Sequence, residues 1–297
     1  MNTILTDEQN DSVRKLVREG YASIARETSA GCCGAGVSCC GSTPQEADKL
    51  ARELGYTVEE LQALPDGANM GLSCGNPAAL AALKPGETVL DLGSGGGFDV
   101  FIAGRKVGAT GRAIGVDMTP EMLGKARHNI AHYRKETGLD NVEFRLGEIE
   151  HLPVADNSVD AIISNCVINL SPDKAQVWRE MARVLKPGGR VAVSDMALIK
   201  RLPPEVLKLV EARIGCVAGA VLVSKTGRMV AEAGLSDVVL KSNPGYVEAL
   251  TDWEDPLYRK LIEFLPAGTK PADFITSLEV QAVKPKGECC GNDCCKA

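Results

Sequence analysis

A short apolar run that leads directly into a glycine-rich turn constrains the fold of this chain more than any other feature. Residues 88–93 (TVLDLG) read as a buried strand, and residues 91–97 (DLGSGGG) form the turn that follows. A helix over 98–106 and a second strand over 112–118 come next, and Asp117 ends that strand. Strand, glycine turn, helix, strand and terminal acid, in this order, are typical of a βαβ unit that binds a nucleotide.

The alternation of strands and helices continues to about residue 200. Further strands are predicted over 141–148, 159–166 and 190–196, and helices over 119–136 and 171–185. The strands are continuous apolar runs, as expected for a parallel sheet that is covered on both faces. The predicted fold class is therefore α/β, with a Rossmann-like, doubly wound, mostly parallel sheet.

Four regions of different character follow from this reading. We expect an N-terminal helical arm with a Cys-rich loop (1–66), a ligand-binding core (67–200), a C-terminal region that covers the site and completes the sheet (201–285), and a disordered Cys-rich tail (286–297). In the arm, one helix begins at Thr43-Pro44 and another at the capping box of Thr57 and Glu60. In the C-terminal region, helices are expected near 205–215, 224–233 and 255–264, and strands near 237–241 and at 274–283.

Charge and apolar content exclude several classes of partner. The chain has 33 basic and 39 acidic residues and a net charge of −6, so neither nucleic acid nor an anionic membrane is expected to bind it. Its longest apolar run, 214–223, is about half as long as a membrane span. The N-terminus shows no apolar segment of a signal peptide, and we therefore expect a cytoplasmic protein.

The turn also indicates which nucleotide is bound. Its pattern is D-x-G-x-G-x-G rather than G-x-G-x-x-G, and an acid beside the turn would repel a pyrophosphate. S-adenosylmethionine carries a sulfonium and an ammonium group and no phosphate, so an acidic turn suits it. Asp117 would bind two ribose hydroxyls, Glu148 would accept from the adenine amine, and the Ile149 N–H would donate to the ring. The candidate cofactor-binding residues are Asp91, Gly93, Ser94, Gly95, Gly97, Asp117, Met118, Glu148, Ile149 and Asn165.

Together with RVLKPGGRVAVSD at 183–195, these motifs resemble those of class I S-adenosylmethionine-dependent methyltransferases. The resemblance covers roughly residues 68–200 and makes the core the cofactor-binding domain. It implies a seven-stranded sheet with an antiparallel last strand, which residues 274–283 would supply.

Cysteine is the residue type whose number and positions are most unusual. The chain has 11, of which eight form adjacent pairs: Cys32/Cys33, Cys39/Cys40, Cys289/Cys290 and Cys294/Cys295. An odd count without a signal peptide argues against a disulfide scaffold and leaves thiols for soft ions or redox chemistry. The pair spacings, CC-x₅-CC and CC-x₃-CC, differ from the C-x₂₋₄-C of structural zinc sites, which makes zinc the lesser alternative.

Three cysteines stand alone, at Cys74, Cys166 and Cys216. Cys166 directly follows the fourth predicted strand, so it is expected beside the ligand at the carboxyl edge of the sheet. Spacing alone does not bring Cys74 and Cys216 to that edge. From composition, each of the three is as readily a small buried apolar residue.

The segments around these cysteines are similar to those of arsenite S-adenosylmethionine methyltransferases. They are GLSCGNP (71–77), SNCVINL (164–170) and GCVAGA (215–220), in this order around the core. The resemblance implies that Cys74, Cys166 and Cys216 bind trivalent arsenic. It also implies that an N-terminal cysteine pairs with Cys74 during turnover, with Cys39 or Cys40 as candidates ahead of Cys32 or Cys33. Vicinal C-terminal cysteines also occur in that family and would collect trivalent arsenic.

The implied chemistry needs thiolates rather than a general base. Trivalent arsenic is soft and three-coordinate, so three thiolates suit it better than imidazole or carboxylate. Its lone pair attacks the sulfonium methyl without losing a proton, and the chain has only three His. Methyl transfer formally oxidises arsenic, so thiols would return two electrons by forming a disulfide that thioredoxin or glutathione reduces. The expected partners are arsenite, methylated arsenicals and that thiol reductant.

Two other functions remain as alternatives. A methyltransferase acting on a small organic acceptor, such as a quinone, would need a base or an enol-binding pocket, and the sequence shows no obvious one. A non-enzymatic, thiol-rich metalloid-binding protein would leave the glycine turn, Asp117 and Glu148 without a purpose.

Overall fold

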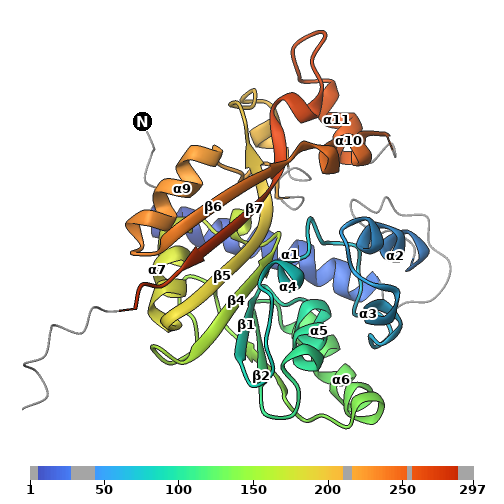
Figure 1. Cartoon of the computed structure of the whole chain (residues 1–297). Coiled ribbons are helices and arrows are strands. Elements are labelled where there is room, and N and C mark those ends of the chain that lie inside the picture. The colour runs from blue at the N-terminus through green and yellow to red at the C-terminus, as the bar shows by residue number, and fades with distance from the viewer. Residues whose placement is uncertain (1–5, 28–43, 210–215, 253–255, 287–297) are drawn as a thin grey trace, which may run out of the picture.

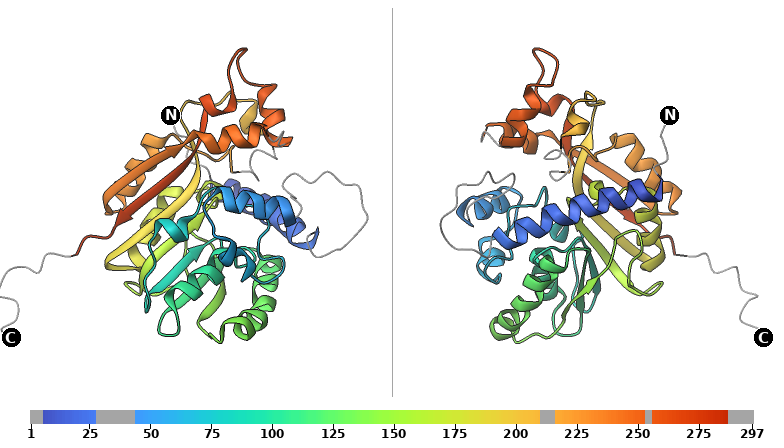
Figure 2. Two further views of the ribbon diagram at one scale, coloured as in Figure 1. Left: turned by 45° about the vertical axis from the view of Figure 1, so that its right-hand side comes forward. Right: turned by 180° about the vertical axis from the view of Figure 1, so that it is seen from behind.

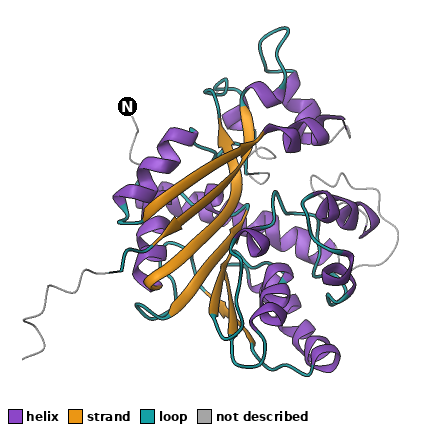
Figure 3. Cartoon of the chain, viewed as in Figure 1, coloured by secondary structure: helices purple, strands orange, loops and turns teal. Residues whose placement is uncertain are grey.

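A seven-stranded sheet forms the centre of the computed structural model, which describes residues 6–27, 44–209, 216–252 and 256–286 (Figures 1 and 3). The strands are β1 (Thr88–Leu92), β2 (Arg112–Asp117), β3 (Val142–Leu146), β4 (Val159–Asn165), β5 (Leu185–Leu198), β6 (Ser236–Asn243) and β7 (Ile275–Val283). Their order is β3-β2-β1-β4-β5-β7-β6. Strands β1 to β5 pair in parallel, and β7 runs antiparallel to both of its neighbours. The predicted fold class, including the antiparallel last strand, is confirmed.

Helices cover both faces of the sheet and its carboxyl edge. They are α1 (Asp7–Glu27), α2 (Pro44–Glu53), α3 (Val58–Gln62), α4 (Pro77–Leu80), α5 (Phe98–Val107), α6 (Pro120–Thr137), α7 (Lys174–Val184), α9 (Val223–Glu232), α10 (Pro244–Asp252) and α11 (Pro256–Ile262). The capping box predicted at Thr57 is present: its side chain accepts from the Glu60 N–H, and the Glu60 side chain accepts from the Thr57 N–H. Short 3₁₀ turns occupy Ile168–Leu170, Val206–Lys208 and Pro271–Asp273.

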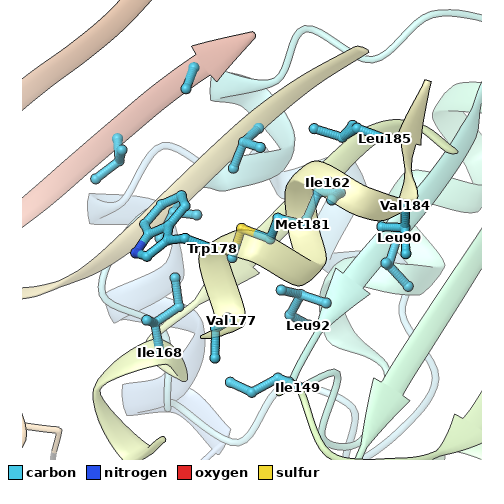
Figure 4. Packing of buried hydrophobic residues seen from close by; sticks show 14 of the residues in the cluster. Leu90, Leu92, Ile149, Ile162, Ile168, Val177, Trp178, Met181, Val184 and Leu185 are labelled. Carbon is cyan, nitrogen blue, oxygen red and sulfur yellow. The ribbon is translucent and has the colours of Figure 1, made fainter. Parts of the chain in front are cut away.

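Different helices bury the two faces of the sheet. On one face, Trp178 and Met181 of α7 pack against Leu90 and Ile162 of the central strands (Figure 4). On the other face, α5 and α6 contribute an aromatic contact between Phe101 and Tyr133, whose ring centroids are 5.3 Å apart. Because β1 is buried on both faces from Val89 to Leu92, its apolar residues do not alternate with exposed polar ones, and its acid, Asp91, is buried as well.

Several predicted boundaries were wrong. The helix expected near 205–215 is a 3₁₀ turn at Val206–Lys208 in its described part, and residues 210–215 lie outside the described ranges. Strand β5 begins at Leu185 rather than 190, because Leu185 pairs with Val159 and an irregularity in the ladder admits the glycines that follow. Helix α7 is capped by Asp173, since the Ser171 hydroxyl donates to Glu150 instead. Helix α10 was not predicted.

The sheet topology places a crevice at the carboxyl ends of β1 and β4. Strand β1 lies between β2 and β4, and successive strands are added on opposite sides of it, which is where open α/β sheets bind ligands. Helix α1 crosses the back of the molecule, and α10 and α11 lie beyond the end of β5 (Figure 2). Within the described ranges, no helix has the length and apolar character needed to cross a bilayer.

Candidate active site

Two adjoining hollows occupy the crevice. The larger has about 690 Å³ of space and the smaller about 430 Å³, and both are partly open to solvent. Leu72, Gly93 and Asn165 line both of them, so they meet at the glycine turn and at the end of β4. Each of them is in the size range of small-molecule sites.

Most of the predicted cofactor residues line these hollows. Gly93, Asp117, Met118, Ile149 and Asn165 line the larger one, and Asp91, Gly93, Ser94 and Asn165 line the smaller one. Gly95 and Gly97 lie within the turn itself, with φ of 50° and 93°, values that favour glycine. Glu148 lines neither hollow; its carboxylate lies beside Arg14.

Asp117 ties the glycine turn to the end of β2. One carboxylate oxygen accepts from the Gly95 N–H at 2.9 Å, and the other accepts from the Thr119 N–H at 2.8 Å. Burial raises the pKa of Asp117, and these backbone N–H groups oppose that rise. The side chain is thus held at the wall of the larger hollow.

Two further buried carboxylates flank the turn. Burial, together with the negative charges of Asp99 and Asp117, raises the pKa of Asp91 well above its usual range. Burial raises the pKa of Asp99 to about 6, against hydrogen bonds from Tyr56 and Asn165. Asp99 was not predicted, although it stands in the first turn of the helix that follows the glycines. Asp91 and Asp99 line the smaller hollow, and Asp117 lines the larger one. Three buried acids around the glycine turn favour a cationic ligand, and the sulfonium and ammonium of S-adenosylmethionine fit this set of side chains.

Helix α1 supplies a wall that the sequence did not predict. Arg14, Val17 and Tyr21 line the larger hollow. The Arg14 Nε lies 3.3 Å from Glu148 Oε2 and 3.6 Å from Glu150 Oε1. The pair with Glu150 is the more protected, because that side chain is only 4% exposed. Residues 12–25 form a weakly amphipathic stretch in the sequence, but that pattern does not tell which surface the helix covers.

The three isolated cysteines lie close together beside the larger hollow. A disulfide joins Cys74 to Cys166, with their Cα atoms 6.1 Å apart. The Cys216 Sγ donates to the backbone carbonyl of Cys166 at 2.8 Å, and Cys216 is buried. Cys166 also lines the larger hollow, so these sulfurs adjoin the predicted donor site.

The paired cysteines near the two ends of the chain lie outside the described residues. These are Cys32, Cys33, Cys39 and Cys40 in the N-terminal loop, and Cys289, Cys290, Cys294 and Cys295 in the tail. The pairing of Cys74 with Cys39 or Cys40 therefore stays a prediction. In the described structure, the partner of Cys74 is Cys166.

Two glycines allow the cysteine loops to approach the sheet. A Cβ on Gly75 would overlap the Ser194 side chain of β5, so only glycine lets the loop carrying Cys74 lie so close. A Cβ on Gly219 would overlap the Asn169 carbonyl oxygen, which brings the loop carrying Cys216 against the segment after Cys166. Both contacts join segments that are far apart in the sequence.

Asp195, near the end of β5, is a second residue that the sequence analysis missed. One of its carboxylate oxygens and the Sγ atoms of Cys74 and Cys166 lie within 4.8 Å of one another. Burial raises the pKa of Asp195 to about 6, against hydrogen bonds from the Met196 and Asn169 N–H groups. Its signal was weak, since an acid inside an apolar strand has no recognisable spacing to the cysteines.

Known methyltransferases are similar to this chain in sequence. A family model described as a methyltransferase domain matches residues 83–234. An arsenite methyltransferase of Halobacterium salinarum is 46% identical over 280 residues, which cover 91% of this chain and 70% of the relative. The chain belongs to the arsenite methyltransferase family. It is a class I S-adenosylmethionine-dependent methyltransferase by family and by fold.

Two more relatives show how far the family likeness extends. An arsenite methyltransferase of Aquipseudomonas alcaligenes is 44% identical over 52% of this chain and 46% of the relative. The crystal structure of an arsenic(III) S-adenosylmethionine methyltransferase from Chlamydomonas reinhardtii matches with a TM-score of 0.60 and 32% identity. That match covers 83% of this chain and 76% of the algal chain.

Proposed function

We propose that the protein transfers the methyl group of S-adenosylmethionine to trivalent arsenic, both arsenite and methylarsenite, held by Cys74, Cys166 and Cys216. The observation that carries the proposal is the meeting of three cysteines, from three distant segments, beside a hollow lined by the glycine turn. The names of the bacterial, archaeal and algal relatives support the same acceptor.

On the donor side, the chain supplies charge and shape. S-adenosylmethionine supplies a methyl group on a positively charged sulfur. Asp91 and Asp99 would favour the cationic end of this molecule in the smaller hollow. Asp117, at the end of β2, would accept hydrogen bonds from the ribose, and Met118 and Ile149 would give the adenine apolar walls.

On the acceptor side, the disulfide between Cys74 and Cys166 must first be reduced. Each thiol then gives its proton to a hydroxide of arsenite, which leaves as water when a sulfur–arsenic bond forms. Cys216 would complete the set by turning its Sγ away from the Cys166 carbonyl. Three thiolates suit a soft, three-coordinate metalloid. The apolar side chains packed around Cys74 and Cys216 would help to keep water from the methyl group.

Arsenic must also be returned to its trivalent state after each transfer. Forming the arsenic–carbon bond uses the arsenic lone pair and raises its formal oxidation number. A thiolate that attacks one ligating sulfur forms a disulfide and leaves the shared electron pair on arsenic, which restores that lone pair. Cys39 or Cys40 would provide this thiolate against Cys74, and thioredoxin or glutathione would then reduce the disulfide.

The proposal is tested with the purified, reduced protein, arsenite and labelled S-adenosylmethionine. We expect S-adenosylhomocysteine and methylated arsenic to appear together, and only when arsenite is present. Cys166→Ser should abolish both products, while calorimetry should show unchanged binding of S-adenosylmethionine. A Cys166→Ser protein that methylates arsenite and methylarsenite at the wild-type rate would contradict the proposal.

A further inference from the structure

Asp195 is the one carboxylate that the described residues bring against the acceptor cysteines. One of its oxygens lies within 4.8 Å of the Sγ atoms of both Cys74 and Cys166. The residue is 7% exposed. It lines neither of the two hollows, and its place beside Cys74 and Cys166 puts it at the acceptor end of the crevice.

The carboxylate is fixed by three N–H donors. The Met196 N–H and the Asn169 side-chain amide donate to one oxygen at 2.8 and 2.9 Å, and the Asn169 backbone N–H donates to the other at 3.1 Å. N–H donors favour the ionised form of a carboxylate. Asn169 also belongs to the segment that follows Cys166, so the same contacts hold the charge and the sulfur-bearing loop in one arrangement.

Methyl transfer moves a positive charge from the donor to arsenic. The arsenic lone pair forms the arsenic–carbon bond, the sulfonium–carbon bond breaks, and its electron pair remains on the departing sulfur, which becomes a neutral thioether. Arsenic bound to three thiolates and one methyl group then carries the positive charge. Asp91 and Asp99, which line the smaller hollow, would stabilise the charge where it starts, and this by itself would oppose the transfer.

We propose that Asp195 is a catalytic residue of this transfer, whose fixed carboxylate stabilises the positive charge as it develops on arsenic held by Cys74 and Cys166. The inference rests on the proposed function. A negative group that interacts with the positive charge only as that charge forms on arsenic lowers the barrier to methyl transfer and does not tighten substrate binding. Because the carboxylate is already oriented by its N–H donors and shielded from water, little reorganisation accompanies the step.

The test compares wild-type protein with Asp195→Asn, which is nearly isosteric and neutral. Each reduced protein is loaded with one equivalent of arsenite and mixed with excess labelled S-adenosylmethionine, and the first methyl transfer is timed. We expect the rate constant of Asp195→Asn to fall about 100-fold, as when one charge-stabilising group is removed from an active site. Arsenite affinity is measured by equilibrium dialysis and S-adenosylhomocysteine affinity by calorimetry. Both should stay within about threefold of the wild-type values, because the positive charge on arsenic forms only during the transfer and not when either ligand binds.

Asp156→Asn is the matched control. The Asp156 side chain is 67% exposed, and its substitution removes the same charge from the surface of the protein. Its transfer rate should equal that of the wild type. If Asp195→Asn fails to fold, Asp195→Glu keeps the charge but displaces it, and its transfer rate should fall about tenfold at unchanged arsenite affinity.

The outcomes separate the two proposals. A wild-type protein that binds arsenite but transfers no methyl to it overturns the proposed function, and the role of Asp195 falls with it. If the wild type is active and Asp195→Asn transfers the methyl group at the wild-type rate, the role of Asp195 alone is overturned. Where Asp195→Asn does not fold, a wild-type rate in Asp195→Glu has the same meaning. A loss of arsenite affinity that matches the loss of rate also overturns it, because it would make Asp195 a binding or structural residue.

Discussion

The side-chain oxygen of Asn165 accepts a hydrogen bond from the backbone N–H of Cys74, at 3.0 Å. The amide nitrogen of the same side chain donates to the Gly75 carbonyl at 2.9 Å. Asn165 therefore fastens the loop that carries one acceptor cysteine to the end of β4, which leads into Cys166. Because Asn165 also lines both hollows, one side chain links the donor site to the acceptor site.

Replacing Asn165 should disturb both substrates at once. In Asn165→Ala, the loop of Cys74 loses its two anchoring hydrogen bonds, and we expect kcat/KM for arsenite to fall about 100-fold through misalignment of the acceptor. The KM for S-adenosylmethionine should rise as well, since the wall between the hollows is removed. Steady-state kinetics with each substrate varied in turn measures both effects. Asn129→Ala on α6 is the control, and equal losses in the two variants would refute the link.

The contact of Arg14 with Glu148 and Glu150 makes α1 a cover of the donor site. Arg14→Leu keeps much of the apolar stem but leaves Glu150 without its cation, so the helix should pack less firmly over the larger hollow. We expect the KM for S-adenosylmethionine to rise about tenfold, in line with the loss of a charge-assisted contact, and kcat to change little. Hydrogen exchange of α1 amides should become faster in the same variant.

Arg18→Leu is the matched control for that prediction. Arg18 lies one turn further along α1 and is exposed at the surface, away from the larger hollow. Its substitution should leave the KM for S-adenosylmethionine unchanged. If both variants raise that KM equally, the loss of positive charge on α1 causes the effect, and the contacts of Arg14 with Glu148 and Glu150 do not.

The fold and the position of the glycine turn beside the crevice could be predicted because their signals are local. The glycine turn follows β1 and Asp117 ends β2. Because β1 and β2 pair in parallel, the turn and Asp117 lie side by side at the same edge of the sheet. Cys166 was placed by the same reasoning, since it directly follows β4. The antiparallel β7 was implied by the family resemblance and not by periodicity.

The acceptor site could not be predicted from the residues alone, because its contacts join distant segments. Cys74 and Cys216 reach Cys166 only because Gly75 and Gly219 permit close approach, and a glycine in a loop does not reveal its neighbour. Arg14 and Asp195 likewise act across long separations in the sequence. Their roles depend on which surface α1 covers and on which side of β5 the acid points, and neither is encoded in a spacing.

Asp99 should make the stability of the protein depend on pH. Its folded-state pKa is about 6, raised mainly by burial, against about 3.9 in an unfolded chain. The stability it contributes is therefore full below pH 4 and is lost as the pH rises through 6. Asp99→Asn does not titrate, so its free energy of unfolding relative to wild type should increase by up to about 3 kcal/mol between pH 4 and pH 8.

Urea denaturation at a series of pH values measures this difference. Lost hydrogen bonds to Tyr56 and Asn165 shift the variant by an amount that does not depend on pH, so only the change of the difference is diagnostic. Asp140→Asn, at a carboxylate that is 71% exposed, should show a nearly constant difference. A constant difference for Asp99→Asn as well would show that Asp99 titrates normally in the folded protein.

Gly219 offers a test of the acceptor site that leaves every cysteine in place. In Gly219→Ala, the new Cβ would overlap the Asn169 carbonyl oxygen, so the loop of Cys216 must move away from the segment that follows Cys166. Arsenite affinity should weaken about tenfold, the usual scale of an overpacked contact, while S-adenosylmethionine affinity stays the same. Gly124→Ala on α6 is the matched control, because its Cβ would meet no atom within 4 Å and alanine favours a helix. Unchanged arsenite affinity in Gly219→Ala would mean that Cys216 does not have to lie beside Cys166 for arsenic to bind.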